Sequence, residues 1–96
     1  MANSGGAGPT PGGSQALYGI TTTTLVRGSR GVVFRVSVLV AGSAAGGVYN
    51  SSSTSSLTDQ VFVIPSTVGI YEVLWPCANG IVIVPPTGGT VAVSYE

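Results

Sequence analysis

The chain has 96 residues, of which only six are charged, and it contains no histidine, a single cysteine and a formal net charge of zero. Ordinary soluble domains are about one-quarter charged. Without histidine the chain cannot form a Ser-His-Asp triad. The scarcity of titratable side chains means that we expect no enzyme activity, no cofactor and no metal site. Nucleic acid is not expected as a partner either, because nucleic-acid binding needs a clustered basic surface.

The first part of the chain, residues 1–16, is rich in glycine, proline and small polar residues, and it predicts a flexible N-terminal arm. It has neither the basic start nor the apolar stretch of a secretory signal peptide. No stretch of the chain reaches the roughly 18 apolar residues of a membrane-spanning helix. We therefore expect a protein made in the cytoplasm, with no membrane partner and with one domain over residues 17–96.

Strand patterns begin at Leu17. Residues 17–26 and 32–40 are rich in valine, threonine and other strand formers, and a turn with two glycines separates them. The two segments predict a β-hairpin. Alternation with period two over the second strand predicts one apolar face, made of Phe34, Val36, Val38 and Val40.

Five further short strands are predicted over residues 48–50, 61–64, 68–75, 81–84 and 90–95. The serine-rich residues 51–56 predict a surface loop, and Pro76 is expected to end the strand before it. Asn79-Gly80 predicts a second hairpin. With no helical period of useful length, the chain is expected to be all-β: a small antiparallel sandwich or barrel, jelly-roll-like, of six or seven strands.

The large side chains are expected to pack in the core, although aromatic residues are also enriched at subunit interfaces. They are Phe34, Phe62, Tyr71, Trp75 and Tyr95. Cys77 is expected to act as a small buried hydrophobe. Glu72 is expected to be an exposed strand residue, with an ion pair to an arginine as the alternative.

The size of the domain predicts partner chains. About 80 residues bury only about 60–65% of the surface that the unfolded chain exposes, and small domains usually need an additional source of stability. Cys77 has no second cysteine for a disulfide. Association with other chains is therefore the expected source.

Several short motifs of the chain resemble those of a group of small virion proteins encoded by tailed bacteriophages and prophages. They are the threonine run of residues 21–24, AGSAAG at 41–46, PSTVGIY at 65–71 and PCANGI at 76–81. The chain resembles this group over residues 21–96 and departs from it in the serine-rich stretch between Tyr49 and Gln60. The resemblance implies a capsid decoration (cement) protein, a homo-oligomer with a trimer favoured, bound to the major capsid protein on the capsid exterior of the virion. The alternative is a tail or head-fibre component with a host-surface binding role.

For a decoration protein, two regions are predicted to contact the capsid or a neighbouring subunit. One is the arm. The other is the basic turn with its flanks, residues 27–35, which hold all three arginines and would face an acidic capsid surface. The alternative for this segment is a solvated turn and strand edge. The residues are Ala2, Asn3, Pro9, Thr10, Pro11, Gln15, Arg27, Arg30 and Arg35.

Overall fold

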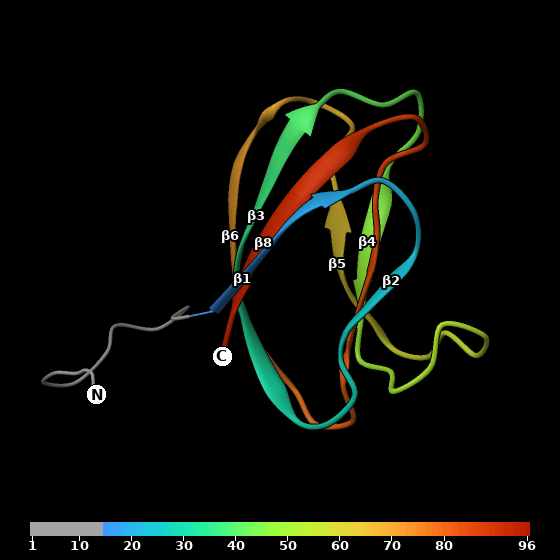
Figure 1. The fold of residues 1–96 in the computed structure, drawn as a ribbon, viewed down its shortest axis with the longest axis vertical. Coiled ribbons are helices and arrows are strands. Elements are labelled where there is room, and N and C mark those ends of the chain that lie inside the picture. Colours follow the sequence, from blue (N-terminus) through green and yellow to red (C-terminus); the bar gives the residue numbers. More distant parts are fainter. Residues whose placement is uncertain (1–14) are drawn as a thin grey trace, which may run out of the picture.

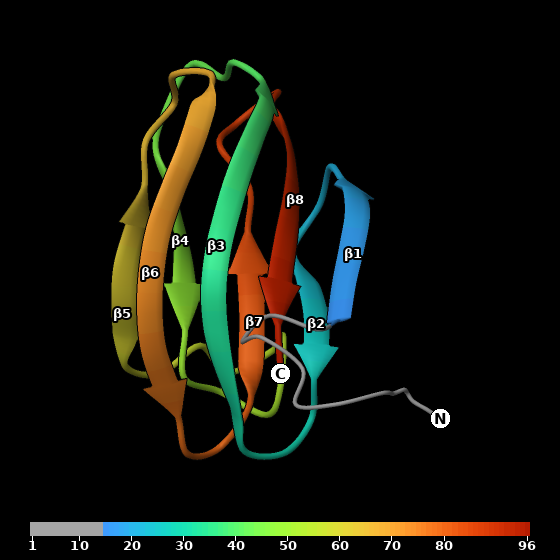
Figure 2. The same cartoon turned by 90° about the vertical axis from the view of Figure 1, so that its left-hand side faces the viewer.

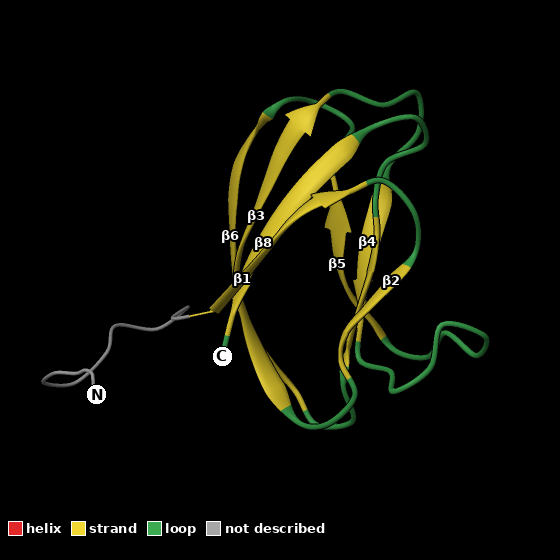
Figure 3. Ribbon diagram, viewed as in Figure 1, coloured by secondary structure: helices red, strands yellow, loops and turns green. Residues whose placement is uncertain are grey.

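The computed structural model describes residues 15–96, which form eight strands and no helix (Figure 3). The all-β prediction is confirmed. The strands are β1 (Gln15–Ile20), β2 (Thr24–Arg27), β3 (Gly31–Val40), β4 (Gly46–Tyr49), β5 (Gln60–Ile64), β6 (Gly69–Cys77), β7 (Ile81–Val84) and β8 (Thr90–Tyr95).

The strand count is eight rather than six or seven because the predicted first strand is two strands. Gly19 has a positive φ of 66°, and the chain leaves one sheet after Ile20 and enters the other at Thr24. The first strand also begins at Gln15, so Gln15 and Ala16 belong to the β-domain rather than to the predicted arm.

The strands form two four-stranded antiparallel sheets that pack face to face (Figure 1). Their orders are β1-β8-β3-β6 and β2-β7-β4-β5. The first half of the chain pairs with the second half, in the strand pairs β1–β8, β2–β7, β3–β6 and β4–β5. These four pairs form one long antiparallel ribbon that is wound into two layers. This is the strand order of an eight-stranded jelly roll, so the predicted sandwich is confirmed in its jelly-roll form.

Both predicted hairpins are wrong. β2 and β3 lie in different sheets, and so do β6 and β7, which Asn79-Gly80 helps to connect. Asn79 does not have the positive φ that a type I′ hairpin turn requires. Among the described strands, the one consecutive pair that hydrogen-bonds is β4–β5, whose connection is the serine-rich loop. The short turns instead cross from one sheet to the other.

The core between the sheets consists of β-branched side chains rather than aromatic ones. Its fully buried members are Val and Ile residues together with Cys77, at exposures of 0–4%: Ile20, Val33, Val36, Val38, Val48, Ile64, Ile81, Ile83, Val91 and Val93. The expected burial of Cys77 is confirmed, and that burial raises the pKa of its thiol.

The prediction that the aromatic residues pack in the core is confirmed only in part. Phe62, Tyr71 and Tyr95 are partly buried at its margin, and Trp75 is 51% exposed. Trp75 lies in β6, which is an edge strand with a neighbour on one side only. An edge position leaves a large ring partly uncovered, whereas the compact β-branched residues of the central strands fill the space between the sheets.

A line of bulges crosses the first sheet and shifts the predicted faces. Between Val33 and Arg35, β3 advances two residues, while β8 advances one and β6 advances three. An extra residue reverses the alternation beyond it. Val33 therefore lies in the core together with Val36 and Val38. A second register shift, between Val38 and Val40, changes the face beyond it, and Val40, predicted to face inward, is 51% exposed.

Pro76 does not end β6, contrary to expectation. The strand continues to Cys77, with Pro76 opposite Val32 of β3. The missing N–H of a proline is tolerated at a sheet edge, where no further strand needs the donor. Leu74, two residues earlier, has a left-handed φ of 50° within the bulge.

Candidate functional site

The outward face of the β1-β8-β3-β6 sheet, which lies towards the viewer in Figure 2, contains a shallow depression of about 230 Å³. Small side chains of the two central strands line its middle: Ser37 of β3 together with Ala92 and Ser94 of β8. Large side chains of the two edge strands line its sides, Tyr18 of β1 at 75% exposure and Ile70 of β6 at 73%. The depression arises because the large residues lie on the outer strands.

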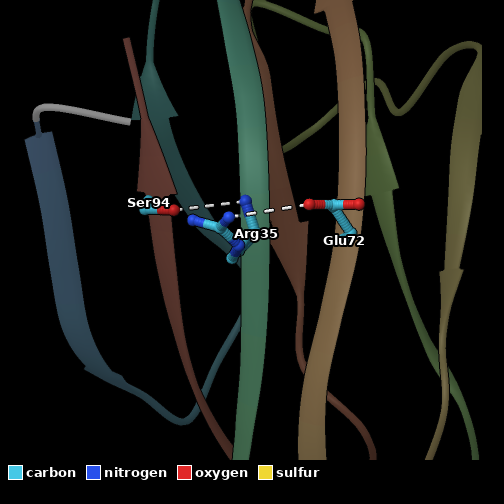
Figure 4. Close-up of polar contacts among 3 residues, drawn as sticks. All are labelled: Arg35, Glu72 and Ser94. Atoms are coloured by element: carbon cyan, nitrogen blue, oxygen red, sulfur yellow. Dashed lines mark hydrogen bonds and ion pairs between the residues drawn. The ribbon is translucent and has the colours of Figure 1, made fainter. Parts of the chain in front are cut away.

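The charged residues of this face form a single ion pair. Arg35 Nη2 lies 3.6 Å from Glu72 Oε2, and both side chains are more than half exposed (Figure 4). The backbone N–H of Arg35 donates to Ser94 Oγ at 3.1 Å. An exposed pair of this kind contributes about 0–1 kcal/mol. The pair stabilises the fold little, but it makes this part of the face electrically neutral.

Exposed apolar side chains continue from the depression along β6 and the adjoining end of β3. They are Leu39, Val40, Val68, Ile70 and Leu74, each at least 51% exposed. Trp75 is also 51% exposed, but it lies opposite the buried Val33 and therefore at the inner edge of the sheet. The predicted exposure of Glu72 is confirmed, and Ile70 and Leu74 of the same strand are exposed with it. Exposed apolar side chains that gather on neighbouring strands of a small protein indicate an interaction site. We call the outward side of the β1-β8-β3-β6 sheet, from Tyr18 across to Ile70, the sheet face.

The three arginines of the predicted basic contact are divided between two places. Arg27 and Arg30 lie at the β2–β3 connection, where Arg27 Nε donates to the Arg30 carbonyl oxygen at 2.7 Å. Arg35 lies on the sheet face beside Glu72. The structure therefore does not join the three into one basic surface.

The other predicted contact residues belong to the arm. Gln15 begins β1, opposite Tyr95 of β8. Ala2, Asn3, Pro9, Thr10 and Pro11 lie outside the described residues.

The sequence did not predict the centre of the sheet face. Tyr18, Ser37 and Ala92 come from three strands that are distant in the chain and adjacent only in the folded sheet. One indication was present: Ile70 and Leu74 are apolar residues at positions that alternate with inward-facing ones. Apolar residues on both faces of an edge strand indicate that its outer face also makes contacts.

The serine-rich loop between β4 and β5 is held by its own hydroxyl groups. Ser51 is buried at 3% exposure; its Oγ lies 2.8 Å from the Ser56 carbonyl oxygen and accepts from the Ser53 N–H at 3.2 Å. The Asn50 side chain accepts a hydrogen bond from the Asn79 backbone N–H at 2.8 Å, which ties this loop to the β6–β7 connection. These polar groups satisfy one another and serve the local structure.

Within residues 15–96, no three histidine, cysteine or carboxylate side chains gather closely enough to hold a metal ion. A search of the same residues found no helix with the length and apolarity needed to cross a membrane. No protein-family model, curated protein or solved structure matches the chain.

Proposed function

We propose that this protein is a structural component of a bacteriophage virion, which binds the outside of the capsid as a decoration protein and stabilises the shell. The observation that supports this proposal best is the sheet face, an exposed apolar surface with one neutralising ion pair on a small jelly-roll domain. Many functions use the same fold, so this surface, and not the strand order, supports a binding role.

The physical demands on such a protein fit the chain. A decoration protein acts through many copies, each with modest contact area, because simultaneous contacts multiply a weak affinity. A net charge of zero limits repulsion between copies that crowd on one surface. Binding of this kind needs apolar area and shape rather than titratable groups, and the chain has few of the latter.

The partners in this proposal are the major capsid protein and further copies of the chain. Mass spectrometry of purified virions, with quantified copy numbers, tests it directly. We expect the protein in every particle at a copy number comparable with that of the capsid subunits. Absence from the particle, or only a few copies, would refute the proposal.

The predicted arm contact has its own test. We expect deletion of residues 2–14 to leave the thermal unfolding of the β-domain unchanged, since β1 begins at Gln15, and to weaken co-sedimentation with capsids that lack the protein. A truncated protein that decorates these capsids as well as the full chain would contradict the contact. Replacement of Arg27 and Arg30 by alanine, with the arm intact, separates the basic turn from the arm.

The second candidate function is a tail or head-fibre component that binds the host surface. One observation favours it: the exposed Tyr18 ring lies in a depression that Arg35 and serine hydroxyls also line, and such groups can contact a sugar. Electron microscopy of particles labelled with antibodies distinguishes the two. Label on the tail or at fibre bases would support the second candidate, and label over the whole shell the first.

A further inference from the structure

We propose that the sheet face binds the sheet face of a second copy of this chain, around a two-fold axis that runs parallel to the strands midway between β3 and β6. This inference does not depend on the proposed function, because the pairing would form in solution without a capsid. It covers only the β3 and β6 part of the sheet face, so the β1 and β8 part stays open to a capsid. It rests on two cross-strand residue pairs that one axis brings into complementary positions.

The first pair is the ion pair. Arg35 and Glu72 are directly opposite each other on β3 and β6. A two-fold axis between these strands exchanges their positions, so Arg35 of each copy lies over Glu72 of the other. A face with one positive and one negative charge at exchangeable positions is complementary to itself. A uniformly acidic or basic partner would instead leave one of the two charges opposite a like charge.

The second pair lies two residues further along the same strands. Ser37 of β3 is directly opposite Ile70 of β6. The same axis places Ile70 of each copy, which is 73% exposed, over Ser37 of the other copy at the middle of the depression. A large apolar side chain thus meets a small one, as happens when two sheets interdigitate at about 10 Å.

The size of the depression also favours a side chain as its occupant. Its volume is about 230 Å³, whereas pockets for small molecules usually measure about 300–1,000 Å³ and enclose most of the ligand. An open depression of this size accommodates one side chain from a facing surface better than it encloses a separate ligand.

A parallel axis one strand further along fits less well. An axis between β3 and β8 would place Arg35 of each copy over Ser94 of the other copy. The two Arg35 side chains would then lie next to each other. It would also place Ser37 over Ala92, two small residues, and leave a gap between the sheets. Like-charge repulsion and unfilled space both disfavour that arrangement.

The pair is expected to be weak. Overlap of two nine-residue strands, about 4.8 Å apart with a rise of about 3.4 Å per residue, gives roughly 300 Å² of flat sheet per copy. Stable interfaces bury about 800 Å² per partner. Pairing should therefore depend strongly on concentration in solution. It predicts an even number of copies, unlike the trimer expected from the resemblance.

Sedimentation velocity of the full chain, from micromolar to millimolar concentration, tests the pairing. We expect the mass of the native protein to rise from one copy towards two. Arg35→Glu leaves two carboxylates on the face and Glu72→Arg leaves two guanidinium groups, so each variant alone should remain a single copy. An equimolar mixture of the two variants should recover the pair, because the opposite faces then complement each other.

The matched control is Val63→Glu, which adds a charge at an exposed position of β5 in the other sheet and should associate like the native chain. Circular dichroism shows whether each variant is folded, and Ile70→Asp, at an exposed position, provides an independent variant that should abolish pairing. The inference is overturned if the native chain remains a single copy throughout, forms three copies, or associates equally well as Arg35→Glu or Ile70→Asp. It is also overturned if the mixture does not recover the pair.

Discussion

Gly46, the first residue of β4, has no room for a side chain, so Gly46→Ala should destabilise the fold strongly. A Cβ atom there would overlap the carbonyl oxygen of Val84 and lie 2.7 Å from the carbonyl carbon of Pro85 and 2.8 Å from the nitrogen of Pro86. All three are backbone atoms, so no side-chain rotation relieves the clash. Either β4 separates from β7 or the backbone of residues 84–86 moves.

The magnitude follows from this geometry. Overpacking a well-filled site costs about 1–3 kcal/mol, and occasionally more. Here the displaced backbone also belongs to the β4–β7 pairing, so we expect a loss of at least about 3 kcal/mol. For a domain of this size, that loss lowers the Tm by roughly 12–24 °C, at about 4–8 °C per kcal/mol.

Gly28→Ala is the matched control. The nearest atom to a Cβ at Gly28 is Leu25 Cδ2 at 3.8 Å, an ordinary contact. Alanine restricts the unfolded chain, so where it fits it stabilises by about 0.4–1 kcal/mol. Urea unfolding followed by circular dichroism, together with thermal scans, measures both variants. If Gly46→Ala unfolds within about 0.5 kcal/mol of the native protein, the close approach of β4 to the chain after β7 is wrong.

Three further predictions use the same unfolding measurements. Ile83→Ala, in the core, should lower the free energy of unfolding by about 2–5 kcal/mol. Trp75 is half-exposed, so Trp75→Ala should cost about half of the 3–5 kcal/mol typical of a core tryptophan. A larger loss at Trp75 would contradict the β-branched core. Ser51→Ala should cost about 1–3 kcal/mol because it removes the partner of a loop N–H, while the exposed Ser52→Ala should stay within about 0.5 kcal/mol of native; equal effects would argue against a loop held by Ser51. Burial raises the pKa of the Cys77 thiol above its ordinary 9.0. The contribution of this thiol to the free energy of unfolding is therefore complete at neutral pH, and it falls as the pH rises past about 9, where the thiol of the unfolded chain ionises. The unfolding free energy should thus decline more steeply in the native protein than in Cys77→Ala, and parallel pH profiles would refute this.

The positions of several strands could be predicted because their limits are local. The predicted strands 81–84 and 90–95 coincide with β7 and β8, and 61–64 differs from β5 by one residue. Each is a run of apolar or β-branched residues with proline or glycine beside it. A strand of this kind can be recognised without knowledge of its neighbours.

The strand partners could not be predicted in the same way. Asn79-Gly80 favours a hairpin in isolation. In the folded chain, however, β6 and β7 belong to opposite sheets and bury their apolar sides in the core between them. The preference of a two-residue turn is small compared with the burial of whole strands. Tertiary packing therefore overrides the local preference.

The candidate site shows the same division. The outward positions of Ile70 and Glu72 could be predicted from alternation along one strand, and so could an ion pair between Glu72 and an arginine. The depression between Tyr18 and Ile70 could not, because it needs four strands from both ends and the middle of the chain to lie side by side.

Composition, together with alternation along single strands, was enough to predict that this protein is all-β, short of charge and rich in β-branched residues. The folded arrangement was needed to show that eight strands form a jelly roll, that Trp75 lies at an edge rather than in the core, and that the apolar sheet face contains one ion pair and one depression. The physical reason is that strand pairing and bulges depend on contacts between residues far apart in the chain, where the burial of whole sheet faces outweighs the preference of any turn.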